Sequence, residues 1–135
     1  QVGIHVFVPL GPGVAFEIAK SLADLLGRLL QVRHPDVSTM ERHVESRKGR
    51  LYIDTGQTGR SRTIVAPYSV RAYPGATVST PLTWDEVHLA LNPRELTIFS
   101  VPDRVREHGD AMQELLDVRP DLPQAIARLQ KLFGL

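Results

Sequence analysis

One acidic side chain, Asp54, stands almost alone in a strongly basic part of the chain. Between residues 42 and 71 there are seven Lys or Arg, opposed only by Glu45 and Asp54. A carboxylate among cations can hold a divalent metal that faces a polyphosphate, and it can equally form half of a structural ion pair. A basic stretch is typical of phosphate binding, although a solvated basic loop has the same composition. Charge alone leaves both interpretations open.

The hydrophobic pattern predicts the elements that would position Asp54. The apolar run 51–53 predicts a short strand that ends at this acid, followed by a polar, glycine-containing loop. Residues 63–70 predict another strand, which Pro67 restricts to an edge or a bulge because proline cannot donate to a ladder. Arginines that follow or precede these strands would then lie near the acid.

The first third of the chain predicts a strand and a long helix. Residues 3–10 alternate Ile and Val with other side chains, which is typical of a strand. Residues 14–33 carry leucines at helical spacing, and Pro35 ends the pattern. A strand this early and a sheet this thin predict that an upstream half is missing, or that the chain forms a homo-oligomer through its strand edge.

The last half of the chain predicts short helices. Thr83 and Glu86 have capping-box spacing around a helix that begins at Trp84, and we interpret Trp84 as a packing anchor rather than a base-stacking platform. Further helical segments are predicted near 93–97, 102–116 and 123–133. The mixture of strands and helices predicts an α+β fold.

Length and composition limit the number of domains and the kinds of site that this chain can have. A chain of 135 residues with 42% hydrophobic and 23% charged residues fits one globular domain, here 1–135. It has no cysteine, which excludes disulfides, thiolate zinc sites and cysteine nucleophiles. The sequence has no run of about 20 apolar residues such as a membrane span needs. Net charge is only +1, so bulk charge does not demand nucleic acid.

The order of three segments resembles a known family. A strand-end Asp-x-x-Gln at residues 54–57 is followed by APYSVR at 66–71 and STPLTWDEV at 79–87. The sequence of these segments resembles the polymerase domain of bacterial ligase D, the primase-polymerase module of non-homologous end joining. The resemblance implies the C-terminal part of a primase-like α+β fold with a mainly antiparallel sheet. It also implies a cytoplasmic, nucleoid-associated DNA-repair protein of bacteria or archaea.

The resemblance implies an activity and its partners. Family members add NTPs or dNTPs to DNA ends or gaps with two Mn²⁺ or Mg²⁺ ions, and Ku and a DNA ligase domain are their usual partners. Carried over to this sequence, Asp54 is the catalytic metal ligand. The nucleotide-binding positions are His5, Gln57, Arg62 and Arg71.

Departures from the family pattern keep two hypotheses open. The family's upstream Asp-x-Asp pair has no match, Val2 replaces a basic residue, and Thr58 replaces Asn. Two metals need several carboxylates, so the first hypothesis is a nucleotidyltransferase fragment that is inactive alone. The alternative is a non-catalytic nucleotide or nucleic-acid binding module derived from the same family.

Overall fold

The computed structural model describes residues 3–134, which form two compact units, each built from two parts of the chain. Unit 1 contains the described residues up to Pro9 together with Ile64–Val118. Unit 2 contains Leu10–Thr63 and the described residues from Arg119 onward. The middle of the chain is thus inserted into unit 2.

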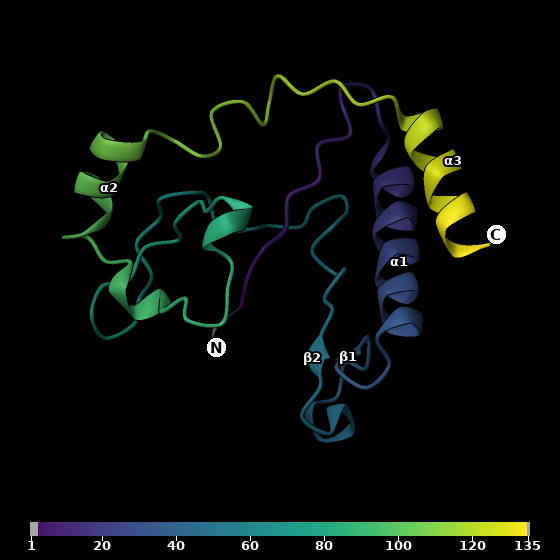
Figure 1. The fold of residues 1–135 in the computed structure, drawn as a ribbon, viewed down its shortest axis with the longest axis horizontal. Coiled ribbons are helices and arrows are strands. Elements are labelled where there is room, and N and C mark those ends of the chain that lie inside the picture. The colour runs from purple at the N-terminus through teal and green to yellow at the C-terminus, as the bar shows by residue number, and fades with distance from the viewer. Residues whose placement is uncertain (1–2, 135) are drawn as a thin grey trace. The chain divides into compact units, whose positions relative to one another are not determined.

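The main helix of unit 2, α1, spans Phe16–Arg33 and confirms the predicted helix (Figure 1). Its buried residues are Gly27 and Leu29. The helix ends at His34, whose amide donates to Leu30 O over 2.9 Å, because Pro35 follows and disfavours helical backbone before it.

The small sheet of unit 2 pairs β1, Ser38–Thr39, with β2, Leu51–Tyr52, in parallel. Both β1 residues are buried, and Ser38 Oγ donates to His34 O over 2.9 Å. The strand predicted at 51–53 is therefore confirmed at its position. The chain returns between the strands through the 3₁₀ helix η1, Val44–Arg47, and this return is what makes the pair parallel.

The expected mainly antiparallel sheet is wrong for this chain. In the part of the chain that the structure describes, the only ladder is the parallel pair of β1 and β2. Antiparallel pairing within residues 3–134 is confined to two isolated bridges, Val70 with Val78 and Thr77 with Thr97. The α+β character stands, since helices flank a small sheet.

The first predicted strand does not form. Residues 3–10 have no strand assignment, and Ile4, Val6 and Val8 are exposed. The alternating pattern is present in the sequence, but a strand exists only where a neighbour accepts and donates its backbone hydrogen bonds. No such ladder involves these residues among residues 3–134.

The strand predicted at 63–70 is replaced by a turn. Tyr68 has a positive φ of 63°, which a strand cannot contain, and Ser69 N–H donates to Ala66 O over 3.2 Å. Pro67 also lacks an amide for a ladder. Tyr68 N–H instead donates to Ser79 O over 2.7 Å, so this turn is held against the 77–79 segment of unit 1.

The short helices of unit 1 confirm the prediction in part. The helix predicted at 102–116 ends at His108, where Gly109 takes a positive φ of 76°, and residues 109–116 are not helical. The 3₁₀ helix η2, Trp84–Glu86, has the full capping box between Thr83 and Glu86. A second 3₁₀ helix, η3, spans Pro93–Glu95, and α2 spans Val101–His108 around the buried Val101. Trp84, however, is 75% exposed, so its interpretation as a packing anchor is wrong in this structure.

The last helix, α3, spans Leu122–Phe133 in unit 2 and lies beside α1 (Figure 1). Asp121 caps its start, since Oδ1 accepts from Gln124 N–H over 2.9 Å. Gly134 ends it in a left-handed conformation. Of the helices in residues 3–134, none has the length and apolar character that crossing a membrane requires.

Candidate metal and phosphate site

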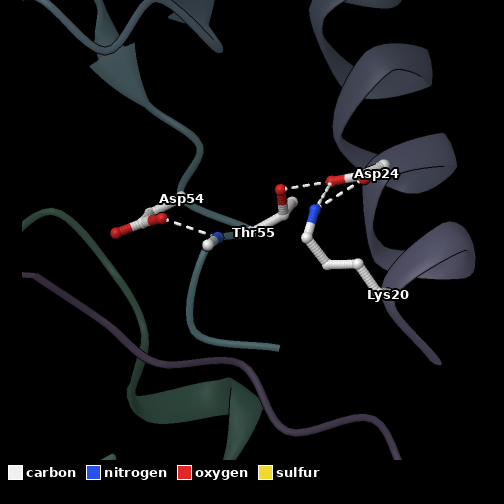
Figure 2. Close-up of polar contacts among 5 residues, drawn as sticks. Lys20, Asp24, Asp54 and Thr55 are labelled. Carbon is white, nitrogen blue, oxygen red and sulfur yellow. Dashed lines mark hydrogen bonds and ion pairs between the residues drawn. The ribbon is translucent and has the colours of Figure 1, made fainter. Parts of the chain in front are cut away.

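Asp54 lies exposed at the first bend after β2, and its carboxylate is oriented by the backbone. Asp54 Oδ1 accepts a hydrogen bond from Gly56 N–H over 2.8 Å (Figure 2). None of the ion pairs among residues 3–134 includes Asp54, so a structural ion pair does not account for this acid. An exposed carboxylate fixed by a backbone donor fits one ligand position of a hard divalent cation.

The residue after Asp54 ties this bend to α1. Thr55 Oγ1 donates to Asp24 Oδ1 over 2.6 Å, and both Asp24 oxygens also accept from Lys20 Nζ over 2.5 and 2.6 Å (Figure 2). We call Lys20, Asp24 and Thr55 the helix–loop clamp. The clamp connects residues 31 positions apart and so joins the Asp54 bend to a rigid element.

The hydrogen bonds of the clamp favour the ionised form of Asp24. The bond from Lys20, and next that from Thr55, lower the pKa of the Asp24 carboxyl below its ordinary value of 3.8, while desolvation opposes them. The Asp24 side chain is 33% exposed, so solvent weakens its attraction to Lys20. At neutral pH the clamp therefore contains a charged acceptor.

The same contact lies close to a glycine in α1. A Cβ at Gly27 would lie 3.0 Å from Met40 Sδ and 3.2 Å from Thr55 Cγ2. A glycine in the middle of a helix lowers helix stability by about 1 kcal/mol relative to alanine. Here it lets the segments that carry Met40 and Thr55 approach the helix closely.

Two of the basic residues in the 42–71 stretch are engaged by backbone carbonyls. Arg47 donates from Nε to Glu41 O over 3.1 Å and from Nη2 to Arg42 O over 2.7 Å, and its guanidinium lies 4.0 Å from the Tyr52 ring centroid. Arg50 Nε donates to Arg47 O over 3.0 Å. These guanidinium groups hold the connection between β1 and β2, which reduces the number of donors available for phosphate.

The other predicted residues of unit 2 are exposed on the loop after β2. Gln57 and Arg62 have exposed side chains without a hydrogen bond to another residue in the range 3–134. Gln57 lies within a tight turn that Arg62 follows, since Thr58 N–H donates to Thr55 O over 3.2 Å. Asp54, Gln57 and Arg62 therefore share one loop.

The remaining predicted residues, His5 and Arg71, belong to unit 1. His5 is exposed, and Arg71 is half-buried with its guanidinium 5.9 Å from the Tyr73 ring centroid. Arg71 N–H donates to Thr77 O over 2.7 Å, which fixes its backbone beside the Val70–Val78 bridge. The predicted set is thus divided between the two units.

A metal site needs more than the described residues supply. Residues 3–134 contain no group of three or more His, Cys, Asp or Glu side chains placed to share an ion. Asp54 fits a single ligand position, and further ligands must come from substrate oxygens, water or other protein groups. Val2, where the family has a basic residue, lies outside the described residues.

Sequence reasoning missed the clamp. The i,i+4 spacing of Lys20 and Asp24 indicates their ion pair, but periodicity says nothing about a contact with Thr55. The signal that was available is Gly27 inside an otherwise leucine-rich helix, because an interior glycine often marks a close backbone approach.

Comparison with solved structures identifies the fold. The chain matches the polymerase domain from Mycobacterium tuberculosis ligase D in complex with DNA with a TM-score of 0.71 and 30% sequence identity. The match covers 83% of this chain and 39% of that one. The architecture is therefore that of a primase-polymerase type of domain, of which this chain has part.

Sequence comparison gives the family. The model of the LigD primase-polymerase domain matches residues 1–112, so the chain belongs to that family. The bifunctional non-homologous end joining protein LigD of Bacillus subtilis (strain 168) is 34% identical over 108 residues, which are 79% of this chain and 18% of that protein. The multifunctional LigD of Mycolicibacterium smegmatis is 33% identical over 115 residues, 84% of this chain and 15% of that protein. The chain thus spans less than a fifth of these relatives.

Proposed function

We propose that this chain forms the part of a DNA end-joining polymerase domain that binds the incoming nucleotide and contributes one metal ligand. The observation that carries the proposal is Asp54, an exposed carboxylate without an ion pair among residues 3–134, oriented by Gly56 N–H at 2.8 Å. When bound, Mn²⁺ or Mg²⁺ ions would neutralise charge on the polyphosphate and activate the attacking hydroxyl.

The cationic and amide side chains have separate roles in this proposal. Arg71 binds triphosphate oxygens, because its planar fork donates paired hydrogen bonds and Tyr73 supports the guanidinium. Arg62 adds charge, His5 donates to phosphate, and Gln57 hydrogen-bonds ribose or phosphate with its amide. The solved relative contains DNA, which supports DNA ends or gaps as the second substrate here. Ku and a DNA ligase domain are the protein partners that the proposal implies.

The chain alone is proposed to be inactive in nucleotide addition. A two-metal mechanism, with ions about 4 Å apart, needs several carboxylates, and Asp54 is one. A second candidate function, a non-catalytic nucleotide or nucleic-acid binding module, is favoured by the same shortage of carboxylates and by Thr58 in place of Asn.

The two candidates differ in how metal affects nucleotide binding. We would titrate the chain with a labelled nucleoside triphosphate in Mn²⁺ and in chelator. The polymerase-derived site predicts tighter binding with Mn²⁺ and loss of that gain in Asp54→Asn. If the affinity for the nucleoside triphosphate changes neither with Mn²⁺ nor in Asp54→Asn, the metal role is rejected and the binding module is favoured.

A further inference from the structure

Asp54 lies on a bend whose backbone is held by hydrogen bonds on both sides. Asp54 and Thr55 are consecutive, and Thr55 Oγ1 donates to Asp24 Oδ1 over 2.6 Å (Figure 2). On the other side of Asp54, β2 is held by its ladder to β1, since Ile53 N–H donates to Thr39 O over 2.8 Å. Asp54 is therefore the residue between two fixed points, one on the sheet and one on α1.

We propose that Asp24 and Thr55 are positioning residues that hold the Asp54 carboxylate in its metal-binding orientation. This inference rests on the proposed function, because it requires Asp54 to be a metal ligand. Asp24 and Thr55 do not contact metal or nucleotide themselves. Thr55 acts through the backbone it shares with Asp54, and Asp24 acts through Thr55. Lys20 completes the clamp by pairing with Asp24.

The geometry explains why a bond to Thr55 would matter to Asp54. The Asp54 side chain bonds forward to Gly56 N–H at 2.8 Å, so the carboxylate and the backbone of residues 54–56 form one small ring. If Thr55 swings away from α1, this ring turns with it. The side chain of Asp54 is exposed, so burial does not hold it in place.

The charge of Asp24 makes the bond strong enough to act in this way. A hydrogen bond to an ionised acceptor is shorter and about twice as strong as a neutral one. Lys20 lies on the same helix four residues earlier and donates to both Asp24 oxygens, including Oδ1, which also accepts the bond from Thr55. Gly27 lies one helical turn further along α1 and leaves room for Thr55 Cγ2.

The experiment uses the whole chain, labelled with ¹⁵N and titrated with Mn²⁺ at neutral pH. Paramagnetic broadening of the Gly56 amide signal reports metal near Asp54, and amide hydrogen exchange at Gly56 reports the orientation of the bend without metal. Thr55→Val removes the hydroxyl while keeping the shape, and Thr55→Ser restores it. Thr63→Val is the matched control, since Thr63 is exposed in unit 2 and has no hydrogen bond from its side chain within residues 3–134.

We expect Thr55→Val to need about 3- to 10-fold more Mn²⁺ for equal broadening, at or below the losses seen when groups that orient metal ligands are changed. Gly56 amide exchange should become several-fold faster. Thr55→Ser and Thr63→Val should resemble the parent chain. Asp24→Asn keeps an oxygen that accepts from Thr55 but loses the charge, so its effect should have the same direction as that of Thr55→Val and be smaller. Retained amide protection in α1 would show that each variant is folded.

The outcomes separate this inference from the proposed function. If Asp54→Asn removes the broadening but Thr55→Val leaves both broadening and exchange unchanged, the metal role stands and the positioning role is rejected. If the parent chain shows no broadening that depends on Asp54, the metal role fails. The positioning inference, which requires that role, then fails with it, even where Gly56 exchange shows that the clamp orders the bend.

Discussion

Glu86 Oε1 accepts an ion-paired hydrogen bond from Arg104 Nη1 over 2.5 Å, which joins η2 to α2 within unit 1. The same glutamate accepts from Thr83 N–H over 2.7 Å through its other oxygen. One carboxylate thus closes the capping box and fixes the helix that follows. The two partners are 29% and 24% exposed, so solvent screens this pair only in part.

The first prediction concerns acid stability. The bond from Arg104, and then those from Thr83, lower the pKa of Glu86 from its ordinary 4.5 to about 2, against desolvation. The stabilisation is therefore complete above pH 4.5 and is lost as pH falls from there toward 2. Arg104→Met should lower the free energy of unfolding by about 1–2 kcal/mol at neutral pH and flatten its fall in acid.

The matched control lies on the same helix. Arg106 pairs with Asp103, but these side chains are 75% and 80% exposed. Arg106→Met should change stability by no more than about 0.5 kcal/mol. Urea unfolding at neutral and acidic pH measures both variants, and equal losses would show that burial does not distinguish the two pairs.

The second prediction concerns Tyr68, whose hydroxyl donates to Asp110 Oδ1 over 2.6 Å. Desolvation, followed by this bond to Asp110, raises the pKa of Tyr68 to about 12 from its ordinary 10. Because the neutral form is favoured in the folded state, the stabilisation is present below pH 10 and is lost as pH rises toward 12. Tyrosinate absorbance should lose its last titrating component in Tyr68→Phe. Asp110→Asn should move that component to lower pH without removing the shift caused by desolvation.

The third prediction concerns phosphate binding by Arg71. Arg71→Ala should weaken binding of single-stranded DNA or a nucleoside triphosphate by about 1–3 kcal/mol, the range for hydrogen bonds to charged groups. Arg71→Lys should recover only part of this loss, since lysine keeps the charge but lacks the fork. The affinity of the parent chain should fall steeply with salt as counterions are released.

Arg33 provides the matched control for Arg71. Its guanidinium lies 5.9 Å from the Phe133 ring centroid, the same distance as between Arg71 and Tyr73, but it lies outside the basic stretch. Arg33→Ala should leave DNA binding nearly unchanged, as should Arg128→Ala on α3. Equal losses from all three variants, or affinity indifferent to salt, would mean that the basic stretch is only a solvated surface.

The fourth prediction concerns catalysis. Primer extension by this chain with Mn²⁺ and all four ribonucleotides should not exceed background, because Asp54 is one carboxylate where two metals need several. Extension that disappears in Asp54→Ala would contradict this expectation directly. It would mean that a second copy or a bound substrate supplies the other ligands.

The fifth prediction concerns α3. Asp121→Ala should destabilise the helix by about 1 kcal/mol, because the Gln124 amide loses its acceptor. Amide exchange across Leu122–Phe133 measures the effect. Asp117→Ala, a change of the same type outside a cap, should leave that exchange unchanged.

The sequence predicted local structure well where the cause is local. Leucine spacing located α1, and the Thr83–Glu86 spacing located η2 with its capping box. The helical pattern at 123–133 likewise located α3. Each of these signals acts between residues a few positions apart, so the local sequence is enough to predict the helix.

Strand pairing was predicted poorly because it depends on contacts between residues that are far apart in the sequence. The alternation in residues 3–10 says that a strand would suit them, but not that a partner ladder exists. The pairing of β1 with β2 was invisible, since Ser38–Thr39 has no apolar pattern. At the site, the sequence placed Asp54 correctly at the end of a strand. The hydrogen bond from Thr55 to Asp24 on α1 could not be predicted, because it joins residues that are 31 positions apart.

Unit 2 can be completed only after the segment inserted into it, Ile64–Val118, has been synthesised. Its α1 is complete at Arg33, yet Phe133, whose ring Arg33 overlies, and Pro120, which approaches Gly11, follow an insertion of 55 residues. At typical ribosomal rates that insertion takes roughly 3–10 s to make. During this interval Arg33 at the end of α1 lacks its contact with Phe133. Synthesis of the segment from Arg119 onward, rather than formation of α1, is then the step that allows unit 2 to make these contacts.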